Sequence, residues 1–530
     1  MRGASHRGKF PVRSKGFLLN LSQLGFLIVT TCIFRFFWSN ASGSKTHFHR
    51  KCPSRRNFLY SQFLFPDFMV KTMKEEKTLK RDGEVRKAWE RAPIPLEFKV
   101  YLFNVTNPNE AAKGAKIHLQ QVGPFVYDEW KAKANITDYP KEDAVTFHML
   151  NTFVFNANKS GSLTGDELIY VPHVLIVGLA SAISRMNPES IGYLDMAIPF
   201  LFGDPSTVFV PVTVRDLLFD GLPVNCNETH FAQAIFCNEF QKNPGFVRKD
   251  EQTFLFSIFG ARNGTPDPIM FKVNRGLRNP HLVGEVMEYN RSKAQKVWSA
   301  AKCNEIRGTD STILPSFVTK DGFDVFAADF CRVISSKFVR ELDYKGIPAY
   351  EYTVDFGDPA DSEKHCYCTT YETCLKKNTI DLTLCAGVPF VVSMPHFYLS
   401  DPEYVNAVGG LSPRKEEHEI VFVVEPMSGT PTMAKRRVQF NIILSRNSEI
   451  TLLHDLNEKQ VILPLFWVDE GVELGEKYLS QLRMLTGLPG MVNIGAIVIE
   501  LIAGGLVIAA MYIKFGRARM GKQSPEGNNQ

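Results

Sequence analysis

The cysteines of this chain are concentrated in one stretch, which restricts how the middle of the chain can fold. Six of the ten cysteines lie between Cys303 and Cys385. The cysteines of Cys366-Tyr367-Cys368 are too close in sequence to bond easily with each other, so we expect each to reach a partner elsewhere. Interlocked bridges of this kind persist only in an oxidising compartment. The stretch therefore predicts that the central domain lies outside the cytosol.

Zinc is the competing interpretation of the same cysteines. A structural zinc site usually carries two closely spaced pairs of Cys or His ligands. This stretch has one Cys-x-Cys pair, and His365 is its only histidine. We therefore favour disulfides over zinc, and we predict no metal site and no cofactor.

The composition excludes a disordered chain, a nucleic-acid-binding protein and a polytopic transporter. With 530 residues, 44% hydrophobic and 22% charged residues, the chain is able to bury a large core. The net charge is +5, and the basic residues are spread along the chain without forming a basic face that could bind a nucleic acid. The mean hydropathy of -0.11 fits one or two membrane spans attached to a large soluble domain.

The clearest membrane signal lies near the C-terminus. Met491 to Ile513 is almost continuously apolar and is long enough to cross a bilayer. Basic residues follow from Lys514, and acidic residues precede the run, so the positive-inside rule predicts a cytoplasmic tail. We place a membrane span at residues 489–513 and the tail at residues 514–530.

The N-terminal end carries a second, less regular apolar run. Residues 1–16 are basic and form a predicted cytoplasmic tail, and residues 17–38 form a predicted first span that contains Arg35. A cleaved signal peptide is the alternative, but no clear small-residue cleavage site follows the run. Residues 39–488 are then the domain between two spans.

Strands dominate the predicted domain. Runs rich in β-branched and aromatic residues predict strands at Phe98–Val105, Val145–Phe155, Phe254–Phe259 and Val438–Leu444. Asn263-Gly264 predicts a tight two-residue turn between such strands.

One apolar segment breaks the strand pattern. Residues 172–202 favour helices, and Arg185 is the only Lys or Arg between Lys159 and Arg215. The segment is unusually apolar for an insertion in a soluble domain.

Six Asn-x-Ser/Thr triplets between residues 104 and 290 predict an extracellular, glycosylated surface. They are Asn104, Asn135, Asn158, Asn227, Asn263 and Asn290.

No catalytic constellation is evident in the sequence. His173 and His396 each follow a proline, and neither has an acidic residue at a sequence spacing typical of a catalytic motif. A histidine without such a partner more often has a structural role. We predict no catalytic residue and no enzyme activity, although triads do assemble from distant residues.

Several stretches resemble the class B scavenger receptor family and, within it, the insect sensory neuron membrane proteins. They include Phe98–Pro108, Val122–Trp130, Phe259–Thr265, Cys303–Asp310, Met394–Phe397, Glu425–Thr430, Ala434–Phe440 and Pro464–Trp467. The resemblance runs from about Phe65 to Gly516, and residues 1–57 depart from it. We therefore predict that the natural transcript encodes a different apolar span directly before Phe65, which puts the predicted first span in doubt.

The resemblance implies an α+β fold, in which a large antiparallel β-barrel-like ectodomain carries a helical apex bundle. Two transmembrane helices flank this ectodomain, and both termini are cytoplasmic. A lipid tunnel runs from the apex towards the membrane. The family pairing carries over as Cys303–Cys366, Cys331–Cys385 and Cys368–Cys374. We add Cys226–Cys237, because both lie in one short segment.

The same resemblance implies a membrane-anchored, lipid-binding sensory co-receptor at the plasma membrane of olfactory neuron dendrites. It would capture hydrophobic odorants or pheromones and pass them through the tunnel towards the membrane. The expected partners are lipid-like ligands, odorant receptor subunits and odorant-binding proteins, and no nucleic acid.

We place the outer entrance of this tunnel at residues 172–202, where Arg185 is the candidate to bind a ligand carboxylate or ester carbonyl. Arg185 as an ordinary solvated charge is the competing interpretation. A scavenger or adhesion receptor for lipids or lipoproteins is the alternative function, and a lipid-hydrolysing ectoenzyme is the third.

Overall fold

The computed structural model of this chain describes residues 70–487, apart from residues 228, 362–363, 369–373 and 388, together with residues 498, 501–502, 504–506, 508–509 and 512–513. The predicted tails and first span, and most of the predicted span at 489–513, lie outside the described residues. Within the described part of the chain, no helix is both long and apolar enough to cross a membrane. The chain divides into two compact units, and the larger unit, Val70–Val492, carries the architecture below.

One antiparallel sheet of 13 strands dominates the larger unit. In spatial order its strands are β10 (Val286–Tyr289), β9 (Pro266–Asn274), β3 (Ala144–Phe155), β2 (Leu119–Tyr139), β1 (Leu96–Val105), β18 (Val461–Glu473), β17 (Thr430–Leu444), β16 (Val421–Glu425), β13 (Ile347–Val354), β12 (Arg332–Tyr344) and β11 (Asp324–Ala327), with β15 (Phe390–Ser393) and β14 (Thr379–Asp381) branching from β17. Thr309 bridges to Glu285 beside β10 and to Val325 in β11, so the two edges nearly meet. The sheet therefore nearly closes on itself and has an inner and an outer face.

Two smaller sheets and several helices complete the unit. The small sheets are β4 (Leu168–Pro172) with β5 (Phe209–Thr213), and β6 (Leu222–Asn225) with β8 (Thr253–Phe256) and β7 (Phe246–Arg248). The α-helices are α3 (Glu84–Glu90), α4 (Pro108–Ala111), α5 (Ala157–Ser160), α6 (Val174–Met186), α7 (Ile191–Phe202), α8 (Phe231–Lys242), α9 (Thr383–Ala386), α10 (Pro402–Ala407) and α11 (Lys415–His418). Residues 70–76 and 476–487 are also helical. These elements confirm the predicted mixed fold with a large antiparallel sheet.

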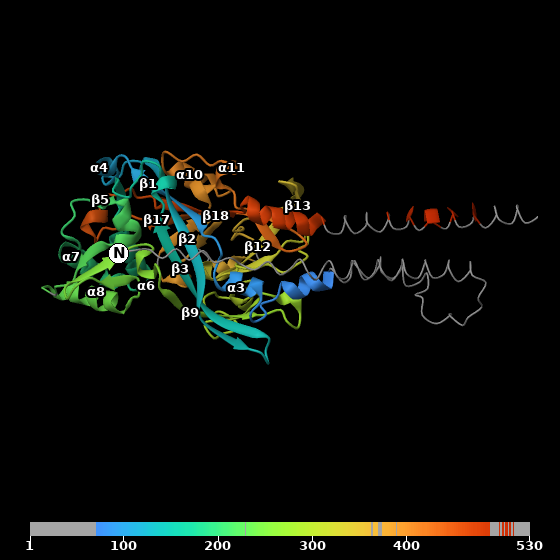
Figure 1. The fold of residues 1–530 in the computed structure, drawn as a ribbon. Coiled ribbons are helices and arrows are strands. Elements are labelled where there is room, and N and C mark those ends of the chain that lie inside the picture. The colour runs from blue at the N-terminus through green and yellow to red at the C-terminus, as the bar shows by residue number, and fades with distance from the viewer. Residues whose placement is uncertain are drawn as a thin grey trace, which may run out of the picture. The chain divides into compact units, whose positions relative to one another are not determined.

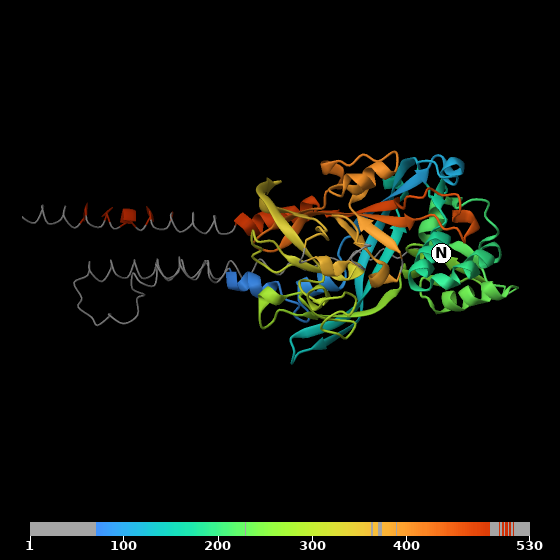
Figure 2. The same cartoon turned by 180° about the vertical axis from the view of Figure 1, so that it is seen from behind.

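The helices α6, α7 and α8 gather at one end of the larger unit, and residues 70–76 and 476–487 lie at the opposite end (Figures 1 and 2). We call these the helical end and the base. The helices α6 and α7 confirm the helical segment predicted at residues 172–202. His173 starts α6, because its side chain accepts a hydrogen bond from the amide of Ile176. Gly203 ends α7 in the left-handed conformation, with φ of 75°.

Four disulfides hold the described chain, and they join the pairs expected from the resemblance and from the short spacing of Cys226 and Cys237. They are Cys226–Cys237, Cys303–Cys366, Cys331–Cys385 and Cys368–Cys374. Each typically contributes ~2–4 kcal/mol by restricting the unfolded chain.

The zinc interpretation has one geometric basis in the structure. His365, Cys368 and Cys374 lie close enough together to hold a metal ion. The sulfurs of Cys368 and Cys374 are bonded to each other, however, so the oxidised cluster offers a metal only the imidazole of His365. This arrangement favours the disulfide interpretation.

The turn predicted at Asn263-Gly264 is present, because the amide of Thr265 donates to the carbonyl of Arg262 at 3.2 Å, but it does not close a hairpin. The preceding strand β8 pairs with β6 and β7, whereas the following strand β9 pairs with β3 and β10, so no hairpin joins them. The Asn263 Oδ1 atom accepts a hydrogen bond of 2.9 Å from the amide of Phe153. The amide of Gly264 donates to the carbonyl of Asn151 at 2.8 Å. The dipeptide therefore keeps its local turn, and contacts with β3 hold this turn in place.

Two buried histidines stack on the outer side of the sheet, with 4.5 Å between the ring centroids of His396 and His418. The amides of Ser412 and Arg414 donate to the Nδ1 atoms of His396 and His418, at 3.1 and 2.8 Å. Both rings therefore fit their neutral forms. Burial lowers the pKa of His396 to about 4, and burial together with His396 itself lowers the pKa of His418 to about 3.

These pKa shifts predict that the protein loses stability in acid. In the unfolded chain these histidines bind protons once the pH falls below about 6.5. In the folded protein His396 stays neutral until the pH falls to about 4. The unfolded state therefore binds more protons in this window, and the free energy of unfolding falls as the pH falls. We expect the melting temperature of the full-length protein to drop between pH 6.5 and pH 4, and the drop to shrink in the variant His396→Gln/His418→Gln. His454→Gln, at an exposed position, is the control, and an unchanged slope in the double variant would contradict the assignment.

Candidate functional site

An apolar patch is exposed at the helical end, on α7 and α8. It consists of Tyr193, Met196, Phe200, Phe231 and Ile235, which are between 38% and 58% exposed. The spacing of three and four residues along each helix places these side chains on one face. The opposite face of α7 is buried in the core. Contiguous exposed apolar side chains mark a binding surface, and we call this group the apical patch.

The apical patch is held in place by polar and covalent links below it. Gln233 is fully buried, and its Nε2 atom donates to the carbonyls of Phe200 at 3.2 Å and Asn225 at 2.9 Å. The disulfide Cys226–Cys237 ties α8 to the end of β6. Because both links join α8 to its neighbours, the rings of the patch are presented on a fixed support.

Arg185, the candidate ligand-binding residue, lies in the last turn of α6 and is already partnered. Its Nη1 atom is 3.1 Å from Asp381 Oδ2 and 3.1 Å from Thr383 Oγ1. Asp381 is the last residue of β14 and Thr383 is the first residue of α9. The Arg185 side chain is 31% exposed. A ligand carboxylate at Arg185 would therefore have to compete with the carboxylate of Asp381.

Sequence reasoning missed an aromatic cluster on the inner face of the sheet. Its members are Phe98, Tyr127, Phe153, Phe219, Phe259, Phe440 and Phe466. Phe259 is central, because its ring centroid lies 5.4 Å from that of Phe98, 5.7 Å from Phe219, and 5.8 Å from both Phe153 and Phe466. Such separations are typical of favourable edge and offset ring contacts.

The rings of this aromatic cluster are not all fully buried. Phe153, Phe219, Phe259 and Phe440 are partly exposed although they pack against the main hydrophobic core. The same core contains residues from α6, α7 and the inner sheet face, such as Ile176, so apolar contact is continuous from the helical end to the cluster.

The predicted strands contain Phe98, Phe153 and Phe440, but nothing in the sequence showed that these rings meet. Phe259 was predicted to end a strand, whereas β8 ends at Phe256 and Phe259 lies in the loop that follows. Phe219 comes from a short helical turn.

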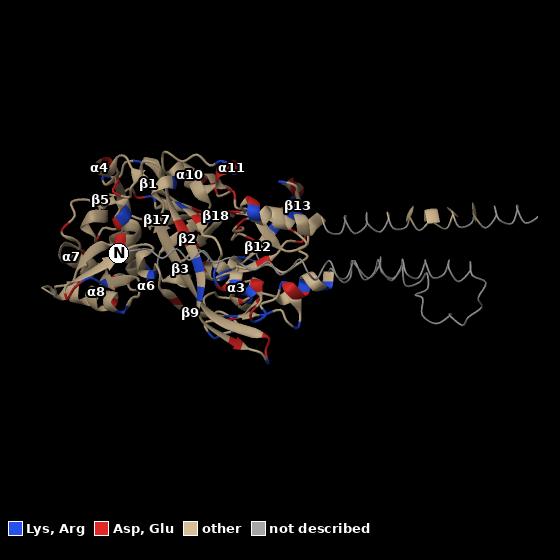
Figure 3. Cartoon of the chain, in the orientation of Figure 1, with Lys and Arg blue, Asp and Glu red and all other residues tan. Residues whose placement is uncertain are grey.

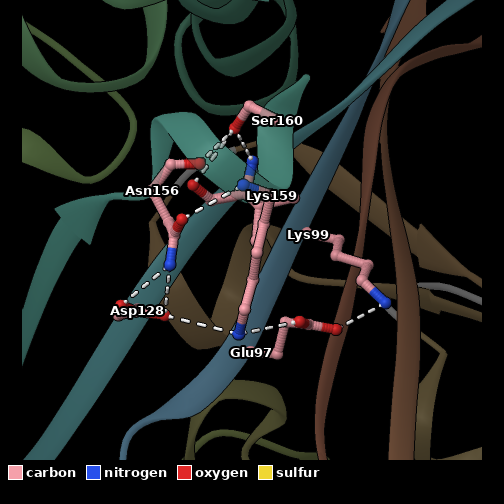
Figure 4. A network of polar contacts seen from close by, with 7 residues as sticks. Glu97, Lys99, Asp128, Asn156, Lys159 and Ser160 are labelled. Carbon is pink, nitrogen blue, oxygen red and sulfur yellow. Dashed lines mark hydrogen bonds and ion pairs between the residues drawn. The ribbon is translucent and has the colours of Figure 1, made fainter.

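A polar network on the outer face fixes the end of β3, which supplies two of the inner rings (Figure 4). Lys159 Nζ lies 3.0 Å from Glu97 Oε1, and the Asn156 side chain donates to both oxygens of Asp128 at 3.1 and 3.2 Å. Ser160 Oγ accepts from the amide of Val126 at 3.0 Å. These contacts attach α5 to β1 and β2, which leaves Phe153 and Phe155 facing inwards and Asn158 outwards.

His173 and His396, which the sequence analysis interpreted as structural, both have structural partners. His173 caps α6, and His396 lies in the outer stack described above, where its Nε2 atom is 2.8 Å from Gln121 Oε1.

The six predicted glycosylation sites differ in their surroundings. Asn135, Asn158, Asn227 and Asn290 are exposed, whereas Asn104 and Asn263 are half-buried. The side chain of Asn263 pairs with the backbone of Phe153 at both its oxygen and its nitrogen, at 2.9 and 3.4 Å. A glycan on this nitrogen would disrupt the attachment of the loop to β3.

We therefore expect glycans at the exposed sites and none at Asn263. Enzymatic deglycosylation in heavy-oxygen water, followed by peptide mass spectrometry, marks each occupied asparagine. The variant Asn263→Gln should leave the number of marked sites unchanged, and the matched variant Asn135→Gln should remove one. A glycan found on Asn263 would contradict this expectation.

Comparison with known proteins agrees with the resemblance expected from the motifs. The sequence profile of the CD36 family matches residues 58–515. Sensory neuron membrane protein 1 of Apis mellifera is 39% identical over 422 residues, which cover 79% of this chain and 81% of that protein. Sensory neuron membrane protein 1 of Ostrinia furnacalis is 38% identical over 491 residues, or 89% and 92% of the two chains. The protein of the same name from Plutella xylostella is 40% identical over 430 residues, covering 80% and 81%. The chain therefore belongs to the CD36 family.

Proposed function

We propose that this chain is a membrane-anchored sensory co-receptor that captures hydrophobic odorants or pheromones at the apical patch. The ligand then passes through the interior of the sheet towards the base, the membrane and an odorant receptor. Relatives named as sensory neuron membrane proteins support the sensory role. Residues 39–488 would form the extracellular domain between two spans, in the plasma membrane of olfactory neuron dendrites.

The observation that carries this proposal is the continuity of apolar contact from the helical end to the aromatic cluster. One hydrophobic core includes the buried faces of α6 and α7 and the inner face of β1 and β18. Binding of a long-chain ligand gains about 0.8 kcal/mol for each methylene that leaves water. A route along the aromatic cluster therefore lets a poorly soluble ligand travel without exposing its chain.

The arrangement of the chain ends also favours this role. The described segments nearest the predicted spans, residues 70–76 and 476–487, both lie at the base (Figure 1). The apical patch lies at the opposite end, where it would meet ligands or odorant-binding proteins.

A scavenger or adhesion receptor for lipids or lipoproteins is the alternative function. The exposure of Phe231 at 58% and Ile235 at 48% favours it, because a flat apolar surface also suits a large particle. This function needs the apical patch but not the interior of the sheet.

Blocking the interior separates the two functions. Phe440 is partly exposed on the inner face of β17, so Phe440→Trp would narrow the route without touching the apical patch. If the larger ring deprives the ligand of apolar contact equal to about two methylenes, the ligand concentration needed for a response rises by about tenfold. Calcium imaging of cells that also express an odorant receptor measures the response, and surface biotinylation measures expression. Val339→Trp, at a 43% exposed position of β12, is the matched control. Normal responses in Phe440→Trp at normal surface levels would favour the scavenger function.

Arg185 gives a second test of ligand capture. Removing the guanidinium should weaken responses to acids more than responses to neutral esters or aldehydes of equal chain length, by about tenfold for one lost charge-assisted hydrogen bond. The variants to compare in the same assay are Arg185→Ala and Arg185→Lys. Equal loss for acids and esters would show that Arg185 serves only to hold Asp381.

A further inference from the structure

One buried arginine differs from the others in having no carboxylate partner. Lys and Arg are interspersed with Asp and Glu over the ribbon of the larger unit (Figure 3). The buried arginines of the described chain, each at most 6% exposed, are Arg86, Arg275, Arg332 and Arg437. The carboxylate of Asp138 lies 3.1 Å from Arg86 and 3.5 Å from Arg275. The carboxylate of Asp469 lies 3.4 Å from Arg437. Arg332, the first residue of β12, forms no ion pair with any described residue.

Aromatic rings lie against the guanidinium of Arg332 where a carboxylate would be expected. Its central carbon is 4.1 Å from the ring centroid of Tyr367 and 5.3 Å from that of Trp298. Such rings attract a cation, but they do not accept its in-plane N–H groups as a carboxylate does. The Nε atom of Arg332 is accordingly buried without a hydrogen-bond partner among the described residues. Burial lowers the pKa of Arg332 to about 10, so the guanidinium still carries its charge at neutral pH.

A small cavity of about 20 Å³ lies beside Arg332. The residues around it include Arg332, Tyr367, Leu375, Thr379, Asp381 and the disulfide Cys368–Cys374. A polar cavity of roughly 10–15 Å³ is enough for one water molecule. The space beside Arg332 therefore admits one small ion or water, and it is far too small for an alkyl chain.

The carboxylate of Asp381 lines this cavity, but both of its oxygens are engaged elsewhere. Asp381 Oδ2 accepts from Arg185 Nη1 at 3.1 Å, and Oδ1 accepts from the amide of Thr383 at 2.9 Å. The charge of Asp381 is thus balanced by Arg185, which leaves the positive charge of Arg332 without a counter-ion. Burying an unpaired charge costs much more than burying a neutral polar group, so a counter-ion suits the cavity better than a water molecule.

We propose that the cavity beside Arg332 binds one small monovalent anion of the halide class, such as chloride. The anion balances the charge of Arg332 and leaves Asp381 to pair with Arg185 in the last turn of α6. Without the anion, Arg332 and Arg185 compete for the one carboxylate of Asp381, and α6 is held less firmly. The site is independent of the proposed route for hydrophobic ligands, so its failure would leave that proposal untouched.

Chlorine-35 NMR of the full-length protein in detergent micelles measures this binding directly. The chloride resonance broadens when chloride exchanges with a site on a large molecule. At constant ionic strength, we expect an excess broadening that saturates with chloride and is displaced by bromide. Gluconate, which is too large for the cavity, should not displace it. Broadening that bromide does not remove, or none beyond that of micelles alone, would overturn the proposal.

Two variants assign the broadening to the cavity by different means. Arg332→Gln removes the charge, and Leu375→Phe fills the space while it keeps the charge. We expect each to raise the chloride concentration needed for half-saturation by at least about tenfold, the effect of one lost charge-assisted hydrogen bond. Arg340→Gln is the matched control, because Arg340 lies on the same strand, is 65% exposed and pairs with Glu351. Leu375→Phe decides the question if Arg332→Gln does not fold, and an unchanged chloride affinity in either folded variant contradicts the site.

Thermal unfolding gives an independent measurement on the same proteins. An anion that binds only the folded state raises the melting temperature by about 1–2 °C for each tenfold increase above half-saturation, for a domain of this size. Chloride in place of gluconate, at constant ionic strength, should produce this shift in the wild-type protein and in Arg340→Gln, and it should be lost in Arg332→Gln and Leu375→Phe. An equal shift in all four proteins would place the effect of chloride elsewhere and overturn the assignment.

Discussion

The register between β17 and β18 is the constraint on which the rest of the molecule depends. Phe440 is opposite Phe466 and Arg436 is opposite Glu470, so rings and charges of the two strands meet on the inner face. Their sequence neighbours point outwards, where Trp467 joins the histidine stack through His418. A slip of one residue would exchange the two faces, because side chains alternate along a strand. The aromatic cluster, the ion pairs of Glu470 with Lys131 and Arg436, and the outer histidine stack are therefore specified together.

Helices and strands could be predicted where a short run of residues determines them. The apolar run at residues 172–202 predicted α6 and α7, and β-branched runs predicted β1, β3 and β17. The Asn263-Gly264 turn also formed, but it closes no hairpin, because the strands before and after it pair with other strands. Local preference is a weak guide wherever tertiary pairing offers stronger partners.

The candidate site was less predictable, because its contacts join residues that are far apart in the chain. Lys131 and Glu470 are separated by 339 positions, and Arg185 and Asp381 by 196. No spacing rule connects such pairs. The sequence did indicate Arg185 as unusual within an apolar segment, but its partner Asp381 became evident only from the fold. Phe259, at the centre of the aromatic cluster, was predicted to end a strand, but β8 stops at Phe256 and the loop beyond it brings this ring into the cluster.

The interleaved bridges have a consequence for damage to the chain. Cys303 bonds to Cys366 and Cys331 bonds to Cys385, so every peptide bond between Cys303 and Cys385 is spanned by at least one of these cross-links. A single proteolytic cut anywhere in this segment leaves the two fragments covalently joined. The segment includes β11, β12 and β13, which form one side of the nearly closed sheet. A protease that cuts this side of the sheet therefore cannot release the fragment while the disulfides remain intact.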